Sequence, residues 1–120
     1  MSTPPTLWHR DHWSTLAYAF TCLGRGGVLD NRRLRLDGDT YPTKLRDGTT
    51  LPGHTDLDCL QDAEDVGILR NILSGFHPVV RFTPEGLKLG QWLCLQMELK
   101  SIRTADLTWD QALTGSGAWL

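Results

Sequence analysis

The segment from Thr55 to Gly90 constrains the fold more than any other part of this 120-residue chain. Its first part predicts a helix over 55–66, because Thr55 or Asp56 can cap the N-terminus and Asp58 completes a capping-box spacing with Thr55. Apolar residues recur along this segment at helical spacing and should form its buried side: Leu57, Leu60, Ala63 and Val66. The first element of the segment is therefore a short amphipathic helix with many acidic residues.

A hairpin and a long helix should follow. Two runs rich in apolar residues, 68–73 and 78–82, flank Ser74-Gly75, which suits a two-residue turn between antiparallel strands. Thr83 can then cap a helix that has Pro84 at its first position and Glu85 in its first turn. We expect this helix to continue to about Ile102.

The long helix carries more apolar residues than one buried face requires. An excess of this kind predicts that a second surface is covered, either by the C-terminal segment or by another subunit, which would make a homodimer through residues 84–102. Thr108 can cap a last short helix through Leu113, with Trp109 packing back on the rest. The apolar residues of the long helix are Leu87, Leu89, Trp92, Leu93, Leu95, Met97, Leu99 and Ile102.

The first third of the chain predicts one helix and one hairpin. Residues 7–23 have apolar residues at near-helical spacing, ended by Gly24, and we interpret Trp8 and Trp13 as packing residues. Residues 32–36 alternate charged and apolar side chains, as a half-buried strand does, and Asp37-Gly38-Asp39 is a turn signal. Residues 40–46 would return as the second strand, with Pro42 placing it on an edge, before another turn at Asp47-Gly48.

Composition favours one ordinary globular domain. Hydrophobic residues make up 40% and charged residues 22% of the chain, and the net charge is −2, so the whole chain offers no electrostatic argument for nucleic-acid binding. There is no apolar run long enough for a membrane helix and no signal-peptide pattern at the N-terminus. The three cysteines are widely spaced within apolar stretches, which predicts reduced core residues and a cytoplasmic protein: Cys22, Cys59 and Cys94.

The sequence offers little for catalysis or for a cofactor. His9-Arg10-Asp11 matches a kinase tripeptide by letters only, and we expect no catalytic residues and no enzyme. The run from His54 to Cys59 is the best metal-like cluster, and His9 and His12, three residues apart on one helix, could join it. Because no second cluster follows at ligand spacing, we predict neither a metal site nor a cofactor.

The motifs after the acidic helix resemble those of a known family. Val66-Gly67-Ile68-Leu69, a hairpin, and Val80-Arg81-Phe82 followed by Thr83-Pro84-Glu85-Gly86 resemble the pattern of winged-helix repressors of the MarR and PadR types. This resemblance covers about a quarter of the chain. It implies an α+β fold, a winged-helix-like domain with a long C-terminal helix. The N-terminal β-hairpin predicted above is extra to the family pattern, which has a second helix near this segment, so that helix is either short or replaced by the hairpin. We therefore expect a single domain over 1–120, with a tail at 1–6, the winged-helix-like core at 7–105 and a C-terminal segment at 106–120.

The charge of the acidic helix argues against the family's usual target. A recognition helix lies between two rows of phosphates, and basic residues on or beside it supply most of the affinity. Here the segment 55–66 has no Lys or Arg. On a helical wheel Asp58, Asp62 and Asp65 form one acidic stripe that should point outward. An ordinary solvated face would explain this stripe as well. The acidic residues expected to bind a basic partner are Asp58, Asp62, Glu64 and Asp65.

Two functions follow from these patterns. The first is a non-enzymatic protein-binding module that presents the acidic helix to a basic, nucleic-acid-binding host complex. Gly27-Val28-Leu29-Asp30 with Arg32-Arg33 is also similar to small proteins of phage and mobile elements, which implies a prokaryotic or phage-infected cell and an inhibitor of the anti-CRISPR type. The alternative is a DNA-binding transcriptional regulator that uses the basic hairpin or the wing, with contacts from Arg32, Arg33, Arg35, Lys44, Arg46 and Arg70.

Overall fold

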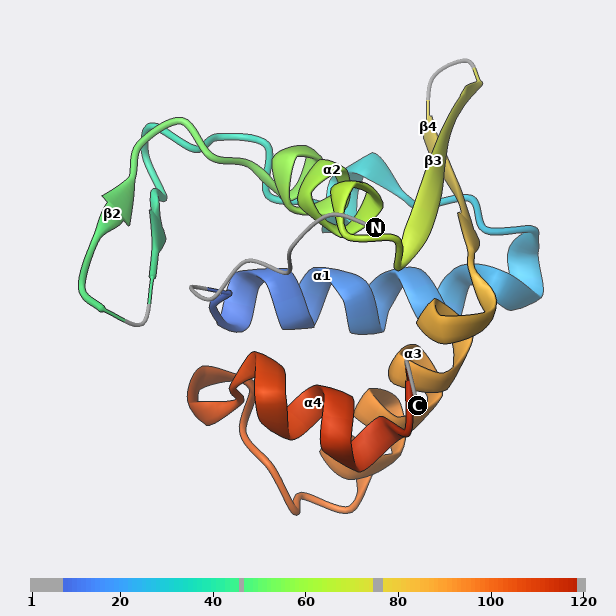
Figure 1. Cartoon of the computed structure of the whole chain (residues 1–120). Helices are drawn as coiled ribbons and strands as arrows, with labels where there is room; N and C mark the ends of the chain where they lie inside the picture. The colour runs from blue at the N-terminus through green and yellow to red at the C-terminus, as the bar shows by residue number, and fades with distance from the viewer. Residues whose placement is uncertain (1–7, 46, 75–76, 119–120) are drawn as a thin grey trace.

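The computed structural model describes residues 8–45, 47–74 and 77–118, and it is an α+β fold built around one central helix. Helix α1 (Arg10–Thr21) crosses the middle of the molecule, with α2 (Asp56–Asp65) packed on one side of it (Figure 1). Helix α3 (Pro84–Glu98) packs on the other side, and α4 (Trp109–Ser116) packs against α3. Short 3-10 turns, η1 (Cys22–Arg25), η2 (Asn31–Arg33) and η3 (Thr104–Asp106), complete the chain.

Two small antiparallel sheets accompany the helices. Strands β3 (Leu69–Ser74) and β4 (His77–Phe82) form a hairpin that stands beside α2, with Leu69 opposite Phe82 and Ser74 opposite His77. Strands β1 (Thr43–Lys44) and β2 (Thr50–Leu51) form a second hairpin at the far end of α2 (Figure 1). The predicted Ser74-Gly75 turn includes Gly75, which lies outside the described residues.

A third stretch of backbone joins the β3–β4 hairpin. Val28 forms an isolated antiparallel bridge with Val79, and the Val80 amide donates to the carbonyl of Gly27 at 2.9 Å. Gly27 has φ = 80°, and a Cβ at this position would overlap the carbonyl oxygen of Val80. Only glycine therefore allows the chain to lie this close to β4.

The core lies between α1 and the elements on either side of it. Trp13 is fully buried and stacks on Trp109 with ring centroids 5.8 Å apart, which confirms the predicted packing of both tryptophans. Further fully buried apolar residues come from α1, α2, α3, strands β3 and β4, and the connecting segments: Leu16, Leu29, Leu60, Ile68, Leu69, Val80, Leu89 and Leu93. Because Trp109, Ala112 and Ala118 are buried in the same core, the C-terminal segment is an integral part of the fold.

The caps predicted for α2, α3 and α4 are confirmed. Thr55 and Asp58 form a reciprocal capping box on α2, and Thr83 accepts a hydrogen bond from the Gly86 amide at the start of α3. Thr108 caps α4 in the same way, with Gln111 as its partner. Each cap satisfies amide groups that the first helical turn cannot pair, so these boundaries could be read from the sequence.

Helix α3 ends earlier than predicted. It stops at Glu98 rather than near Ile102, because Lys100 adopts a left-handed conformation with φ = 55°. The amides of Lys100 and Ser101 then donate to the carbonyls of Met97 and Gln96, which closes the helix end without a glycine. Helix α4 packs against α3. Four apolar side chains of α3 and its C-cap nevertheless stay exposed: Leu87, Leu95, Met97 and Leu99.

The first hairpin lies elsewhere than predicted. Residues 32–36 are not a strand: Asp30 accepts a hydrogen bond from the Arg32 amide and closes the turn η2, and Arg35 pairs its backbone with Asp56. The strands form instead on either side of Asp47-Gly48, where the Thr49 amide donates to the Asp47 carboxylate at 2.8 Å. The turn after Asp37 is present as predicted, and β1 begins immediately after Pro42.

No helix in the described ranges combines the length and the apolar character that crossing a bilayer requires. The cysteines Cys22, Cys59 and Cys94 are free, as predicted. The predicted tail at 1–6 lies outside the described residues.

Candidate functional site

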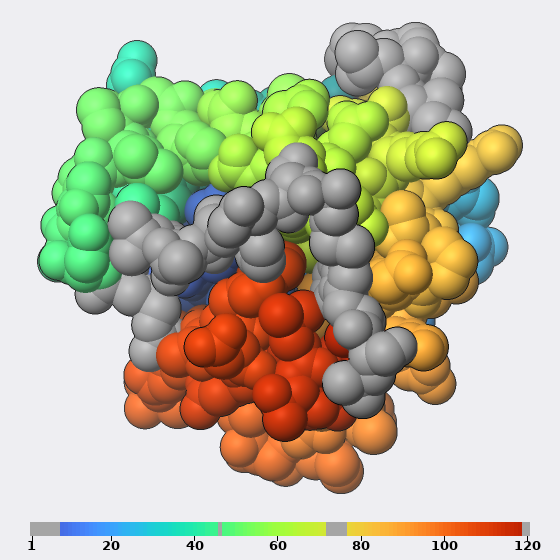
Figure 2. All heavy atoms as spheres, viewed as in Figure 1, coloured from blue at the N-terminus to red at the C-terminus, as the bar shows by residue number. Residues whose placement is uncertain are grey.

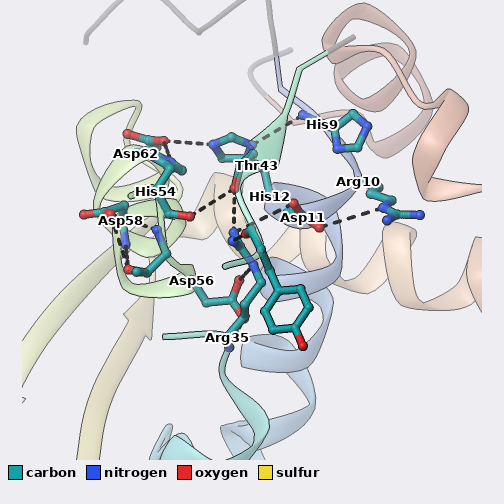
Figure 3. Close-up of polar contacts among 12 residues, drawn as sticks. His9, Arg10, Asp11, His12, Arg35, Thr43, His54, Asp56, Asp58 and Asp62 are labelled. Carbon is teal, nitrogen blue, oxygen red and sulfur yellow. Dashed lines mark hydrogen bonds and ion pairs between the residues drawn. The ribbon is translucent and has the colours of Figure 1, made fainter. Parts of the chain in front are cut away.

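One carboxylate oxygen holds two histidines together at the junction of α1 and α2. Oδ2 of Asp62 lies 2.8 Å from Nε2 of His12 and 3.0 Å from Nε2 of His54. Figure 3 shows the ring of His12 between Asp62 and the backbone nitrogen of His9, which donates to Nδ1 at 3.4 Å. With Nδ1 directed at the His9 amide, Nε2 of His12 is the ring nitrogen that faces Asp62.

Three separate segments position these side chains. His12 lies on the buried face of α1, where its ring stacks on Trp8 with centroids 5.0 Å apart. His54 lies immediately before the N-cap of α2, and its carbonyl accepts a hydrogen bond from the Thr43 hydroxyl at 3.1 Å. Asp62 lies in the second half of α2, on the side of that helix that faces α1. The arrangement therefore exists only when both helices and the loop are folded together.

Burial and the two histidines act on Asp62 in opposite directions. Burial disfavours its charged form, but the hydrogen bonds and charges of His12 and His54 together outweigh burial. The pKa of Asp62 consequently lies below its ordinary value. Asp62 is therefore ionised and engaged at neutral pH.

The thiol of Cys59 lies against the same cluster. Its Sγ atom and one ring nitrogen each of His12 and His54 all lie within 4.8 Å of one another. Cys59 is 2% exposed, and burial, followed by the negative charges of Asp56, Asp62 and Asp11, raises the pKa of its thiol far above the usual range. The thiol is therefore neutral and is not an activated nucleophile.

Arg35 lies at the centre of a second polar network. Its guanidinium lies 3.6 Å from Oδ1 of Asp56 and 3.8 Å from Oδ2 of Asp11, and it donates to the Thr43 hydroxyl and the Tyr41 carbonyl. The backbone amide of Arg35 also donates to the Asp56 carboxylate at 2.6 Å, and the Asp56 amide donates to the Arg35 carbonyl at 2.8 Å. Arg35 thus fastens the segment before β1 to the N-terminus of α2 (Figure 3).

The structure corrects the predicted acidic stripe at one position. Asp62 does not point outward with the other aspartates, because its carboxylate is turned toward His12 and His54. Asp58 is exposed and hydrogen-bonded to Thr55, and Asp65 is exposed and accepts a hydrogen bond from Gln61 at 3.0 Å. Glu64 is partly exposed.

The buried side of α2 also differs from the prediction by one residue. Leu57 is 38% exposed, and Cys59 takes its place in the core. We define the outer face of α2 by the residues that remain accessible: Leu57, Asp58, Gln61, Glu64 and Asp65.

The predicted basic residues do not form one patch. Arg35 belongs to the internal network described above, with a side chain that is only 20% exposed, so it is not available for phosphate contacts. Arg32 is exposed and paired with Asp30, Arg33 and Lys44 are exposed, and Arg46 lies outside the described residues. Arg70 lies on β3 directly opposite Arg81 on β4, and both are exposed.

The histidine–aspartate cluster was only partly visible in the sequence. The run from His54 to Cys59 and the link to His12 were identified there, but Asp62 was assigned to the solvent. Its spacing of three residues from Cys59 was the available signal, since residues three apart share a helix face. The interior residues Asp56 and Asp58 of that run point elsewhere, to Arg35 and to Thr55.

No family model, no curated protein and no solved structure matches this chain.

Proposed function

We propose that this chain is a non-enzymatic protein-binding module that presents the outer face of α2 to a basic surface on a nucleic-acid-binding partner. The observation that supports this proposal is the composition of that face. Asp58 and Asp65 are exposed, Glu64 is partly exposed, and the helix contains no Lys or Arg. Leu57, in the first turn of α2, adds an exposed apolar side chain to this face.

A face of this composition fits a protein better than a nucleic acid. Carboxylates pressed against phosphates would repel, and the repulsion grows as water is excluded. Against a cationic protein surface the same charges speed association and fix orientation, while the exposed apolar side chain supplies buried area. An inhibitor of the anti-CRISPR type, which would cover the nucleic-acid-binding surface of a host complex, is the specific form of this function that we propose.

A winged-helix-like scaffold is part of this proposal, and the order of the elements supports it. Helix α2 is followed by the β3–β4 hairpin and then by α3, in the order that recognition helix, wing and last helix have in such domains. The bridge of Val28 to Val79 adds the third stretch of backbone that pairs with a wing. The segment that would hold the second helix carries η2 and the β1–β2 hairpin instead. The proposal is that this altered scaffold displays α2 to a protein.

Reversing the charges of Glu64 and Asp65 to lysine should abolish partner binding without unfolding the chain. Both residues lie at the C-terminal end of α2, where lysine suits the helix dipole, and neither belongs to the histidine cluster. We expect capture of a basic nucleic-acid-binding protein from nuclease-treated host lysate by the unaltered chain, and its loss in Glu64→Lys/Asp65→Lys. Far-UV circular dichroism and the melting temperature should be unchanged.

The matched control is Glu98→Lys/Asp106→Lys. It changes the net charge equally, and both residues are exposed at sites away from α2. This control should keep the partner. Retention of the partner by the α2 variant, or equal loss in both variants, would rule out the outer face of α2 as the binding surface.

A second candidate, duplex DNA binding through the wing, is favoured by one observation. Arg70 and Arg81 are directly opposed on β3 and β4, and neither forms an ion pair with another described residue. Like charges in this position disfavour the hairpin unless an anion lies between or above them. Phosphate groups of DNA would provide that anion.

This candidate predicts DNA binding that depends steeply on salt. Arg70→Ala/Arg81→Ala should weaken a low-salt gel shift of duplex DNA and reduce the slope of log K against log salt by about 1.8, since each phosphate contact contributes roughly 0.9. Arg103→Ala, an exposed residue outside the hairpin, is the control and should not change the slope. If the unaltered chain shifts no duplex at low salt, the DNA-binding candidate is discarded.

A further inference from the structure

The donor atoms beside Asp62 form a set that suits a transition metal. Nε2 of His12 and of His54 both approach Oδ2 of Asp62, and Sγ of Cys59 lies within 4.8 Å of one ring nitrogen of each histidine. Two imidazoles, one thiol and one carboxylate converge here from α1, from the loop before α2, and from α2 itself. The geometry points to a structural Zn²⁺ site in which His12, His54 and Cys59 bind the ion and Asp62, which contacts both histidines, supplies the fourth ligand.

The distances are close to those that zinc requires. Bonds of about 2.0–2.3 Å in a tetrahedron place neighbouring ligand atoms roughly 3.3–3.8 Å apart. From their present limit of 4.8 Å, the histidine and cysteine atoms would have to close by up to about 1.5 Å. The carboxylate oxygen would move outward by a few tenths of an ångström from 2.8 and 3.0 Å. Side-chain rotations of this size leave both helices in place.

The surroundings favour a cation. Asp11 and Asp56 lie close enough to contribute negative charge at Cys59, and Arg35 is the opposing positive group. A divalent cation at this point would reverse the local effect on the thiol, which would lose its proton to solvent and bind as the thiolate. The negative charges of Asp11 and Asp56 would then stabilise the metal.

The site is closed on one side and accessible on the other. His12 is 4% exposed and Cys59 is 2% exposed, whereas the side chains of Asp62 and His54 are 34% and 18% exposed. Asp62 and His54 line a shallow pocket together with residues of the β2 loop and the first turns of α2. Figure 2 shows the β1–β2 segment and α2 next to each other on one face, and the pocket lined by both would give the ion its entry path.

The donor types select zinc over hard cations. Imidazole and thiolate ligands suit Zn²⁺, whereas Mg²⁺ and Ca²⁺ prefer oxygen throughout. Binding through Nε2 would place the His12 proton on Nδ1 and so break the hydrogen bond from the His9 amide. That bond is long, at 3.4 Å, so its loss opposes the metal only weakly. Four protein ligands leave no open position, which assigns the ion a role in tying α1 to α2.

Titration with metal alone tests this site. The full chain, stripped with a chelator, should bind one equivalent of Co²⁺ with the visible absorption of a tetrahedral site and a near-ultraviolet thiolate band. Zn²⁺ should displace it with a Kd below about 1 μM and should raise the melting temperature. Cys59→Ala should abolish the thiolate band, and His54→Gln should weaken zinc binding by more than about 100-fold.

Cys94→Ala is the matched control, because it removes a partly exposed thiol away from the cluster and should keep the full spectrum. His54→Gln changes a partly exposed side chain outside the helices, so it provides a folded variant if Cys59→Ala is unstable. The site is overturned if the unaltered chain binds less than stoichiometric metal, or if binding is unchanged in His54→Gln. Neither result affects the proposed role of the outer face of α2, which is measured by partner capture.

Discussion

Replacing Gly86 by alanine should destabilise the protein by roughly 3 kcal/mol, even though alanine is the better helix former. Gly86 lies in the first turn of α3 against the backbone of Ile68, whose carbonyl accepts hydrogen bonds from both the amide and the hydroxyl of Thr83 at 3.0 Å. A Cβ on Gly86 would overlap the Ile68 carbonyl oxygen and lie 2.8 Å from its carbonyl carbon. Backbone cannot rotate aside as a side chain can, so α3 would have to move.

The expected gain in helix propensity, about 1 kcal/mol, is smaller than the cost of this overlap. Thermal unfolding should show a melting temperature lowered by roughly 10 °C. Gly24→Ala provides the comparison, because a Cβ at Gly24 meets no atom within 4 Å and its backbone is not left-handed. If Gly86→Ala is as stable as Gly24→Ala, the close contact between α3 and the segment before β3 does not exist in solution.

Replacing Arg35 by methionine should destabilise the protein by about 3 kcal/mol, because it leaves a buried carboxylate without its partner. The side chain of Asp56 is 13% exposed, and its ion pair with Arg35 is reinforced by the backbone hydrogen bonds between the two residues. Methionine keeps most of the length of the side chain, so the loss reports the charge and the hydrogen bonds to Tyr41 and Thr43.

Arg33→Met is the control for Arg35→Met. Arg33 is exposed, and its replacement should change stability by less than about 0.5 kcal/mol. Urea unfolding measures both variants, and a double-mutant cycle with Asp56→Asn isolates the pair. Equal stability of Arg33→Met and Arg35→Met would show that Arg35 is a surface residue, and would return it to the set of candidate phosphate contacts.

The candidate zinc ligands and the Arg35 network lie at the same junction, where α1 and the segment before α2 meet α2. Zinc would tie α1 and the loop before α2 to α2 through His12, His54, Cys59 and Asp62, and Arg35 ties the preceding segment to the start of α2 through Asp56. The Arg35 network holds the start of α2 in place, and a bound zinc ion would add a second tie to the same helix. The unusual segment between α1 and α2 therefore has a clear structural role, which is to hold one helix in place.

Local signals in the sequence were sufficient to predict the capped helices and the second hairpin. Thr55, Thr83 and Thr108 cap their helices as predicted, because a capping hydroxyl and its target amide are only three residues apart. Where a boundary depended on a residue without a local signature, as at Lys100, the prediction was wrong. The strand predicted at 32–36 failed for a related reason, since Arg35 is held by Asp56, which lies 21 residues further along the chain.

The sequence by itself therefore determined the N-terminal caps of α2, α3 and α4. It also determined the β3–β4 hairpin, the free cysteines and the acidic composition of α2. Only the tertiary structure decided which carboxylates of α2 face solvent. Asp62 and Asp65 are similar in sequence terms, but the packing of α1 against α2 brings His12 to Asp62 across 50 residues of chain and leaves Asp65 outside. The direction of a side chain at the edge of a helix face is set by its neighbour on the other helix, and no local pattern encodes that neighbour.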